Sequence, residues 1–393
     1  MRILLLNYEF PPIGGGGGYV TQFLGEHFAK AGGEVFLLTS RYRELSTVEQ
    51  KNGIHIIRIP VLRKRPDVCS VHEMATYVLS AVITAHRLLR KWKPDIVQAF
   101  FGVPSGPVAY VIHKRYAIPY VVFLGGRDVP RRNADPPAYR YWYSLLKPAI
   151  RAVWTNAAAV VACSNGLRDL ARQTDSRVPI QVIPDGVDLS SFQSVERITP
   201  SSKVCLLVVS RLIPRKRIDL LIDALVKLKT RHPFIVRIVG DGPERRALEQ
   251  RVIKHELSSK IHFIGAVSYA KLIKYYNEAD VFVHCAEAEG MPLVVLEAMA
   301  CGLPIVATRV QGIEDLVEPG ENGYLYDPGD VDTLARYLTD IIDFKNQRLS
   351  MGQQSSQKVR SYDWSAIAQQ YLDLYQQIIR AKNRSHEPQT RLL

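Results

Sequence analysis

Two glutamates that stand eight positions apart, Glu289 and Glu297, are the side chains whose spacing best suits chemistry. Glu289 precedes Pro292, which fits the first turn of a helix, and Glu297 falls about two turns later among apolar residues. A buried carboxylate is costly unless it is paired or hydrogen-bonded. At ~1.5 Å of rise per residue the step covers roughly 12 Å, about the separation of the sugar ring and the ribose in a nucleotide sugar. One ligand could therefore contact both acids; the alternative is an N-terminal helix acid plus an unrelated surface acid.

The segment Met291-Pro292-Leu293 opens the helix that we predict over residues 291–301. The first turn of a helix has backbone N–H groups without intrahelical acceptors, and the positive end of the helix dipole lies there. Both features suit a phosphate group. The sequence thus places a candidate phosphate site between the two acids.

Arg211 and Lys216 follow a predicted strand, 203–210, and stand five positions apart. A guanidinium offers a planar fork of donors and an ammonium offers a compact charge. The two together can bind a diphosphate and neutralise it as it leaves, without a metal. A solvated basic loop is the alternative, and the glutamate pair downstream favours the phosphate site.

Five consecutive glycines, 14–18, follow the predicted first strand and precede a helical pattern over residues 19–31. Such a run costs much backbone entropy, so we expect a ligand to approach the backbone of Gly15, Gly16 and Gly17. Their N–H groups can face an anion or sugar hydroxyls. The run is weak as a dinucleotide fingerprint, because no acid at a strand end about 20 residues later supports it.

Length and composition are those of a sizeable globular chain, with 393 residues, 47% of them hydrophobic and 23% charged. That length exceeds one ordinary core and favours two domains. No apolar run approaches the roughly 18 residues of a membrane-spanning helix. The apolar residues 2–7 predict a strand and not a signal peptide, so we expect a cytoplasmic protein.

The cysteines and the acidic pairs do not predict a metal site. The five cysteines form no close metal-ligand pair and sit mostly in apolar surroundings, which is typical of buried thiols. Asp330 and Asp332 follow Pro328-Gly329 at the start of a predicted helix, where helix capping explains them better than metal binding. We therefore expect neither a metal nor a cofactor.

Short apolar runs alternate with longer helical patterns, and this alternation restarts after a serine-rich segment near residue 200. It is typical of parallel strands covered by helices, so we predict an α/β fold with two doubly wound sheets. The expected strands are 2–7, 34–39, 95–100, 119–124, 158–162, 203–210, 234–239, 261–265, 279–284 and 304–307. The expected helices are 19–31, 72–92, 138–153, 164–173, 217–231, 243–256, 269–277, 291–301 and 330–344.

Positive charge is concentrated in the first half of the chain. Residues 1–195 hold 24 Lys/Arg and 14 Asp/Glu, a net of +10 that leaves +3 of the total +13 for the rest. This favours an anionic partner, either a membrane surface or a phosphate-bearing acceptor; a solvated basic face is the alternative. We expect no nucleic acid, because the clusters 63–65 and 131–132 lack interleaved aromatic residues.

The segment 287–304 resembles the signature of retaining glycosyltransferases of family 4. In that family a Glu-Gly loop runs into a helix with a second glutamate, followed by Ala-x-Ala-x-Gly-x-Pro, which here is the stretch from Ala298 to Pro304. The resemblance implies a GT-B fold, with two Rossmann-like domains facing a central cleft. The implied parts are an acceptor-side domain 1–190, a nucleotide-sugar donor domain 200–360, a C-terminal helix 361–382 that crosses back to the first domain, and a disordered tail 383–393.

The resemblance also implies roles for individual residues. Glu289 would face the donor sugar as a catalytic residue, and Glu297 would bind the ribose. Arg211 and Lys216 correspond to the family's phosphate clamp, with Arg217 where glycine is usual. The other implied contacts are those of Gly15, Gly16, Gly17, Met291, Pro292 and Leu293 with the donor diphosphate and sugar, and of Val267 with the neighbourhood of the base.

One position departs from the family. Many relatives carry a histidine that touches the donor sugar near Gly125, and this chain lacks it. Asp128 follows three residues later at the same predicted strand end and could hold the sugar or orient the acceptor hydroxyl, as a second catalytic residue. Capping of a helix or loop is the alternative for Asp128.

The resemblance implies a retaining, metal-independent hexosyl transfer from a UDP- or GDP-sugar to a saccharide or lipid-linked acceptor. The implied setting is cell-surface polysaccharide synthesis, with the protein cytoplasmic or peripheral on the inner face of the cytoplasmic membrane. A nonenzymatic nucleotide-sugar binding protein and a sugar-nucleotide epimerase on the same fold are the alternatives. An apolar helix face formed by Met74, Tyr77, Val78, Ala81, Val82 and Ala85 favours core packing over membrane insertion.

Overall fold

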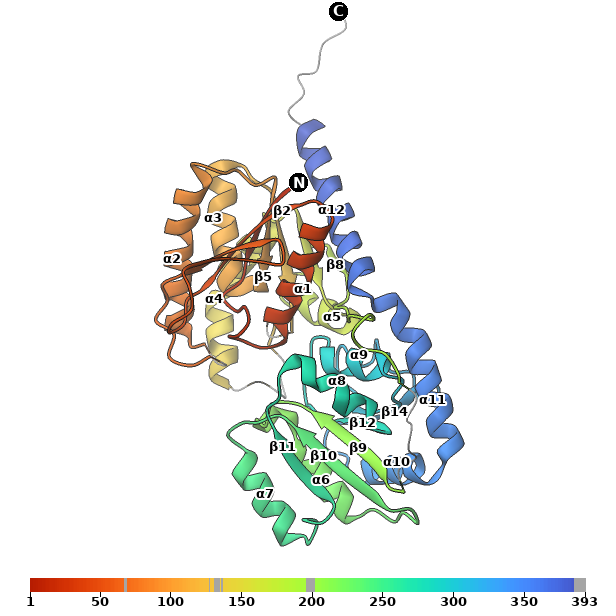
Figure 1. The fold of residues 1–393 in the computed structure, drawn as a ribbon. Coiled ribbons are helices and arrows are strands. Elements are labelled where there is room, and N and C mark those ends of the chain that lie inside the picture. The colour runs from red at the N-terminus through yellow and green to blue at the C-terminus, as the bar shows by residue number, and fades with distance from the viewer. Residues whose placement is uncertain (67–68, 127, 131–134, 136, 196–201, 385–393) are drawn as a thin grey trace, which may run out of the picture. The chain divides into compact units, whose positions relative to one another are not determined.

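In a computed structural model, the chain is divided into two compact units (Figure 1). Unit 1 comprises Met1–Asp185 together with Trp364–Leu393, and unit 2 is Gly186–Asp363. Each unit contains a parallel sheet covered by helices, so the predicted α/β class with two doubly wound sheets is confirmed. The described residues are 1–66, 69–126, 128–130, 135, 137–195 and 202–384.

The sheet of unit 1 has the strand order β3-β4-β2-β1-β5-β6-β7-β8. Its pairs are parallel except for the antiparallel pair β3–β4. The central strands are buried along their whole length, as in a sheet covered on both faces. The strands are β1 (Arg2–Leu6), β2 (Glu34–Ser40), β3 (Val48–Lys51), β4 (Ile54–Ile59), β5 (Ile96–Phe100), β6 (Tyr120–Leu124), β7 (Ala159–Ala162) and β8 (Ile180–Val182).

The helices of unit 1 include the last helix of the chain. α12 packs on α1, where Phe23 stacks on Trp364 with ring centroids 5.5 Å apart. The Tyr375 hydroxyl of α12 donates to Gln98 Oε1 over 2.6 Å, so the predicted return of the chain to the first domain is confirmed. The helices are α1 (Gly16–Lys30), α2 (Val71–Leu89), η1 (Phe101–Ser105), α3 (Gly106–Tyr116), α4 (Pro137–Thr155), α5 (Asn165–Arg172) and α12 (Trp364–Arg384).

The sheet of unit 2 has the strand order β11-β10-β9-β12-β13-β14. Leu206, Val208, Ile238 and Val283 of its strands join helix residues in one apolar core. The strands are β9 (Val204–Val209), β10 (Phe234–Val239), β11 (Ile261–Gly265), β12 (Val281–His284), β13 (Ile305–Thr308) and β14 (Gly323–Tyr326). The helices are η2 (Pro214–Lys216), α6 (Ile218–Val226), α7 (Arg245–Lys254), α8 (Tyr269–Asn277), α9 (Leu293–Ala300), α10 (Val331–Asp343), α11 (Lys345–Lys358) and η3 (Val359–Tyr362).

Several predicted element bounds were wrong. α1 begins at Gly16 and not at residue 19, so part of the glycine run forms its first turn. α9 begins at Leu293, because Pro292 has an extended backbone and precedes the helix. β3, β8 and β14 were not predicted, since they are short edge strands with polar or glycine residues, and β4 was missed although four of its six residues are isoleucine. α12 extends to Arg384, beyond the expected 382, and the rest of the predicted tail, like the cluster 131–132, lies outside the described residues.

Other predictions concern the cysteines, the Asp330 cap and membrane spans. The cysteines are free thiols, all buried except half-buried Cys69, as predicted. The Asp330 side chain caps α10 by accepting a hydrogen bond from the Thr333 backbone, which confirms the capping interpretation. Among the described residues, no helix has the length and apolar character needed to cross a membrane.

Candidate active site

Two side chains of unit 2, Lys216 and His284, contact one oxygen of a third, Glu289 Oε1. The Lys216 ammonium, at the end of η2, donates a hydrogen bond to it, and His284 Nε2, at the end of β12, lies 3.0 Å away. β9 and β12 are parallel neighbours in the sheet, so the loops at their carboxyl ends lie together. The strand order therefore brings Lys216 to the glutamate loop although 73 positions separate the two residues.

The charges around Glu289 keep its carboxyl ionised. Burial opposes ionisation, but the Lys216 ammonium, the hydrogen bond from His284 and the Arg215 guanidinium outweigh it and hold the pKa of Glu289 well below its usual range. The pKa of His284 is lowered, chiefly by burial. A carboxylate is an acceptor only, so the neutral His284 ring donates through Nε2 and positions Glu289.

The loop that carries Lys216, residues 210–217, is connected at two further points to the loop that carries Glu289, residues 285–292, which we call the acidic loop. The Glu287 backbone N–H donates to the Arg215 carbonyl over 3.0 Å. The Arg217 guanidinium donates to Asp219 and to Glu287. Arg217 has a left-handed backbone, with φ 48° and ψ 43°, which is the conformation that glycine adopts readily. Its two ion pairs hold the arginine in the backbone shape that a glycine would take.

Arg211 opens the same loop, directly after β9, and its side chain is exposed. The structure thus places both cations of the predicted phosphate clamp at one sheet edge. The acidic loop is fixed from its other side by Gly312, whose φ is +78°. A Cβ there would lie 1.8 Å from the Gly290 carbonyl oxygen, so the close approach of the two backbones requires glycine.

Glu297 lies on α9 and is only 3% exposed. The Tyr276 hydroxyl of α8 donates to its Oε2 over 2.7 Å, and burial raises the pKa of Glu297 to about 7. The hydrogen bond from Tyr276 offsets part of the cost of burying this carboxyl group. Of the remaining predicted residues in unit 2, Met291 is buried before α9, and Val267 is half-buried between β11 and α8.

In unit 1, polar side chains hold the glycine run at the end of β1. The Asn7 amide donates to the Gly17 carbonyl over 3.2 Å, and the Thr21 hydroxyl donates to the same oxygen over 2.9 Å. The Gly15 N–H donates to Glu9 Oε2 over 3.2 Å. Gly16 and Gly17 form the first turn of α1, where backbone N–H groups have no acceptor within the helix.

Asp128 bridges the loops that follow β5 and β6. Its Oδ1 accepts from the Gly102 N–H and its Oδ2 from the Gly125 N–H, each over 2.6 Å. These contacts are those of a loop cap. Because both oxygens already have backbone donors, Asp128 fixes the position of Gly125 at the edge of the sheet.

The Phe101 ring fills the space beside Gly125 and Gly17. A Cβ at Gly125 would lie 2.8 Å from Phe101 Cε1, and one at Gly17 would lie 2.3 Å from Phe101 Cζ. Phe101 adopts φ 72°, an uncommon conformation for a bulky residue. The space beside Gly125 is therefore occupied by the aromatic ring of Phe101, the residue that follows β5.

The comparisons with known proteins cover both units. A family described as "Glycosyl transferase 4-like domain" matches residues 15–186, and one described as "Glycosyl transferases group 1" matches residues 192–358. A Bacillus subtilis protein named "Putative teichuronic acid biosynthesis glycosyltransferase TuaC" is 31% identical, over 78% of this chain and 76% of its own length. The chain is a family 4 glycosyltransferase.

Solved structures show that this glycosyltransferase has the GT-B fold. Sucrose-phosphate synthase from Thermosynechococcus elongatus superposes with a TM-score of 0.85 at 24% identity, over 97% of this chain and 100% of that chain. Anabaena HepE, in a complex with UDP and glucose, superposes with a TM-score of 0.77 at 22% identity, over 96% and 100% of the two chains. The expected family and fold are confirmed.

Sequence reasoning missed four residues of the glycosyltransferase that contact the predicted ones: Glu9, Phe101, Tyr276 and His284. Phe101 and His284 stand at the carboxyl end of a buried strand, and Glu9 lies shortly after one, which is the signal that could have found them. Tyr276 carries no such signal, because it is an aromatic residue on an ordinary helix.

Proposed function

We propose that this glycosyltransferase moves a hexosyl group, with retention of anomeric configuration, from a UDP- or GDP-sugar to a saccharide or lipid-linked acceptor. The arrangement at Glu289 carries the proposal. An ionised carboxylate sits beside a cation loop and just before the N-terminus of α9, so opposite charges are available for the two parts of a breaking sugar–phosphate bond. A UDP- and glucose-bound structural neighbour supports a nucleotide-sugar donor.

The mechanism we propose is electrostatic. Lys216, Arg211 and the backbone N–H groups of the 291–293 segment neutralise the departing diphosphate as the bond to the anomeric carbon breaks. An ammonium has three donors, so Lys216 can contact a phosphate while it keeps its bond to Glu289. Glu289 faces the positive charge that grows on the sugar ring, and the departing phosphate accepts the proton of the acceptor hydroxyl.

We assign supporting roles in donor and acceptor binding to the remaining predicted residues. Glu297 Oε2 is engaged by Tyr276, and we assign the binding of a ribose hydroxyl to its other oxygen. Val267 contacts the base. Gly15, Gly16 and Gly17 present backbone to the donor, and Asp128 orients the sugar or the acceptor hydroxyl through the loop at Gly125.

We propose that the transfer is independent of metal ions, because two cations of the clamp supply the charge that a metal would supply. Among the described residues there is no cluster of three or more His, Cys, Asp and Glu side chains that could hold a metal ion. The expected result is that EDTA leaves donor hydrolysis unchanged.

We also propose a role in cell-surface polysaccharide synthesis at the cytoplasmic face of the membrane. The name of the Bacillus subtilis relative, which refers to teichuronic acid biosynthesis, supports a saccharide or lipid-linked acceptor. The net charge of +10 on residues 1–195 supports an anionic partner for the first half of the chain.

The test is a donor screen with purified protein. Thermal melting with UDP, GDP and ADP, then with their sugars, identifies the nucleotide, because a ligand of the native state raises the Tm. Hydrolysis and transfer are then measured with the donor found, and the anomeric configuration of the product is read by NMR. Binding without hydrolysis or transfer would establish a nonenzymatic binding protein, a new epimer formed from the donor alone would establish an epimerase, and inversion would refute retention.

A further inference from the structure

Apart from Glu73, which is only 4% exposed in the first turn of α2, the charged side chains of helices α2, α3 and α4 of unit 1 are all basic. After Glu73 near the start of α2, the next acids in the chain are Asp95, Asp128 and Asp135, and none of these three lies in a helix. The cations in these helices and directly after α2 are Arg87, Arg90, Lys91, Lys93, Lys114, Arg115, Arg140, Lys147 and Arg151. The three helices therefore present charge of a single sign.

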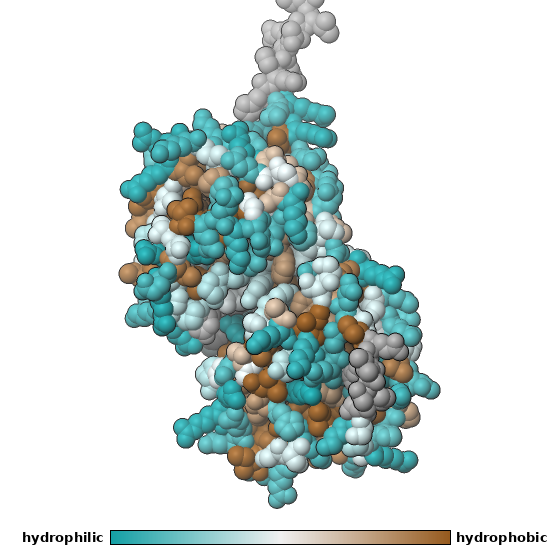
Figure 2. All heavy atoms as spheres, viewed as in Figure 1, coloured by the Kyte–Doolittle hydropathy of each residue, from teal (hydrophilic) through white to brown (hydrophobic). Residues whose placement is uncertain are grey.

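The same helices expose large apolar side chains. α2 packs beside α3, and α3 packs beside α4. In α2 the core takes Tyr77, Ala81 and Ala85, as predicted for this helix, while Leu79 is 65% and Ile83 is 46% exposed. In Figure 2 hydrophobic atoms reach the surface on the side of unit 1 where Figure 1 draws α2. The helix thus has a second apolar face that the core does not use.

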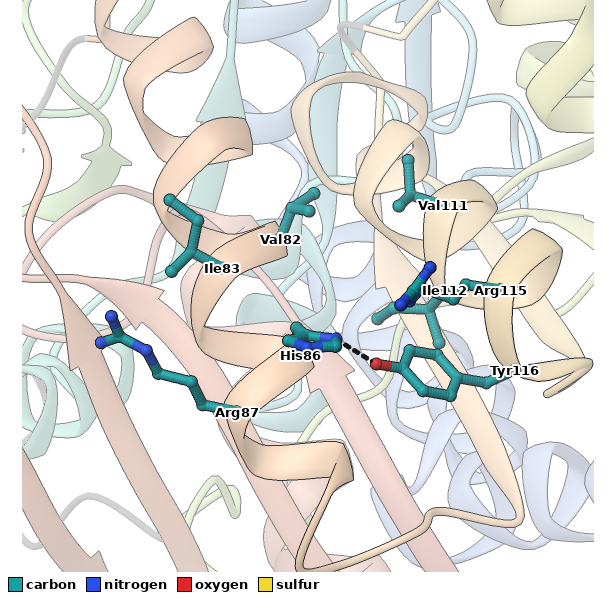
Figure 3. Close-up of a pocket in the computed structure, with 8 residues that line it drawn as sticks. All are labelled: Val82, Ile83, His86, Arg87, Val111, Ile112, Arg115 and Tyr116. Atoms are coloured by element: carbon teal, nitrogen blue, oxygen red, sulfur yellow. Dashed lines mark hydrogen bonds between the residues drawn. The ribbon is translucent and has the colours of Figure 1, made fainter.

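An apolar groove with a basic rim lies between α2 and α3 (Figure 3). Ile83 of α2 and Val111 of α3 stand on its two sides, and Val111 is 40% exposed. A hydrogen bond between His86 and Tyr116 closes one end. The lining residues are Val82, Ile83, His86, Arg87, Val111, Ile112, Arg115 and Tyr116.

α4 extends this surface with amphipathic side chains. Tyr141 is 67%, Trp142 is 47% and Leu145 is 59% exposed, with Arg140 and Lys147 beside them in the helix. Tyrosine and tryptophan favour the boundary between water and lipid, because one end of each ring is apolar and the other is polar. Scattered single apolar residues on a surface are ordinary, but here they gather on three neighbouring helices.

We propose that the outer face of α2, α3 and α4 binds the surface of an anionic lipid bilayer. Leu79, Ile83 and Val111 enter the apolar boundary, and Arg87 and Arg115 contact lipid phosphates. A second copy of this chain is a poorer occupant, since a twofold contact would place cations against cations. This inference rests on the proposed function, because a membrane-bound acceptor is what makes such docking useful.

The experiment measures binding of the full chain to vesicles of phosphatidylcholine alone and of phosphatidylcholine mixed with phosphatidylglycerol. We expect flotation with the mixed vesicles only, weakened by added salt. Arg87→Gln with Arg115→Gln should lower the affinity about tenfold or more, since each cation near an anionic surface contributes to binding. Leu79→Ser with Ile83→Ser should lower it comparably, because two apolar side chains no longer leave water.

The matched control is Ile253→Ser with Leu349→Ser. These side chains of unit 2 are 68% and 55% exposed, so the substitutions remove similar apolar area elsewhere. We expect wild-type vesicle binding from this control, and wild-type melting temperatures and donor hydrolysis without vesicles from all three variants. Vesicle binding by a protein that hydrolyses no donor would support the docking face while the proposed function fails.

Three results would overturn the proposal. They are no binding of the wild type to the mixed vesicles, wild-type binding by the Leu79→Ser/Ile83→Ser variant, and a wild-type dimer that this variant converts to a monomer. The last result would assign the face to contact between copies.

Discussion

Lys216 and Glu289 form an ion pair in which the side chains are only 13% and 11% exposed. Removing one member of a buried ion pair leaves the other charge buried without a partner, whereas removing both charges leaves no such charge. Lys216→Ala should therefore destabilise the protein by about 3 kcal/mol, and Lys216→Ala with Glu289→Gln should recover much of that loss. Denaturant unfolding followed by circular dichroism measures both.

The exposed pair between Lys227 and Asp332 is the control for this experiment. Its side chains are 50% and 82% exposed, so Lys227→Ala should change stability little. Equal losses for Lys216→Ala and Lys227→Ala would mean that the Lys216–Glu289 pair is not a buried, coupled unit.

The proposed phosphate clamp predicts a catalytic defect. Arg211→Ala with Lys216→Ala should lower turnover by at least ~100-fold, because the departing diphosphate loses both charged donors. Arg246→Ala with Lys254→Ala removes the same two charges from exposed positions on α7 and should leave turnover unchanged. Turnover is measured by steady-state kinetics with the donor identified in the screen. Unchanged turnover in the Arg211→Ala/Lys216→Ala variant would refute the proposed phosphate clamp.

The contact between Phe101 and Gly125 predicts coupled effects on stability. Gly125→Ala forces a methyl group to within 2.8 Å of Phe101 Cε1 and 2.9 Å of Phe123 Cε1, which should cost about 1–3 kcal/mol. When Phe101 is also changed to Ala, the combined loss should be smaller than the sum of the two single losses. Strict additivity in the double-mutant cycle would contradict the packing described for the ring.

The left-handed backbone of Arg217 predicts an order of stability between two variants. Arg217→Gly loses the ion pairs to Asp219 and Glu287 but relieves a backbone strain of about 1 kcal/mol. Arg217→Ala loses the same pairs and keeps the strain. The glycine variant should therefore melt at the higher temperature, and the reverse order would show that the side-chain contacts alone set the conformation.

Glu297 predicts a pH dependence of stability. Its pKa is raised from 4.5 to about 7 in the folded protein, so the protonated acid is the favoured form there. The stability that this group contributes is complete below about pH 4.5 and is lost as the pH rises through about 7. Glu297→Gln keeps an acceptor for Tyr276 without the charge, and at pH 8 it should be more stable than wild type by up to about 3 kcal/mol.

Unfolding measured from pH 4 to pH 8 tests this effect. The difference in free energy of unfolding between wild type and Glu297→Gln should widen as the pH rises. A difference that stays constant across this pH range would show that Glu297 does not titrate as described. Glu297→Ala, which also removes the oxygen assigned to the ribose, should in addition weaken binding of the donor.

The amino-acid sequence by itself determined the class of fold and the loops of the candidate site. Alternating apolar runs and helical patterns are local properties of the chain, so they predict two doubly wound sheets without knowledge of the tertiary contacts. Glu289, Lys216 and the glycine run each follow a predicted strand, and the carboxyl ends of parallel strands share one edge of a sheet. Element bounds were less accurate, because Gly16 and Pro292 are helix boundaries that tertiary contacts decide.

Only the tertiary structure decided which side chains touch. His284 meets Glu289, Asp128 joins Gly102 to Gly125, and Phe101 takes the space beside position 125. Tyr276 meets Glu297 from another helix, 21 positions away. Hydrophobic periodicity in the sequence indicates which face of a helix or strand is buried. Contact between two particular side chains depends in addition on the strand order and on the shape of the loops. Those follow from the packing of the whole unit, which no single stretch of the chain contains.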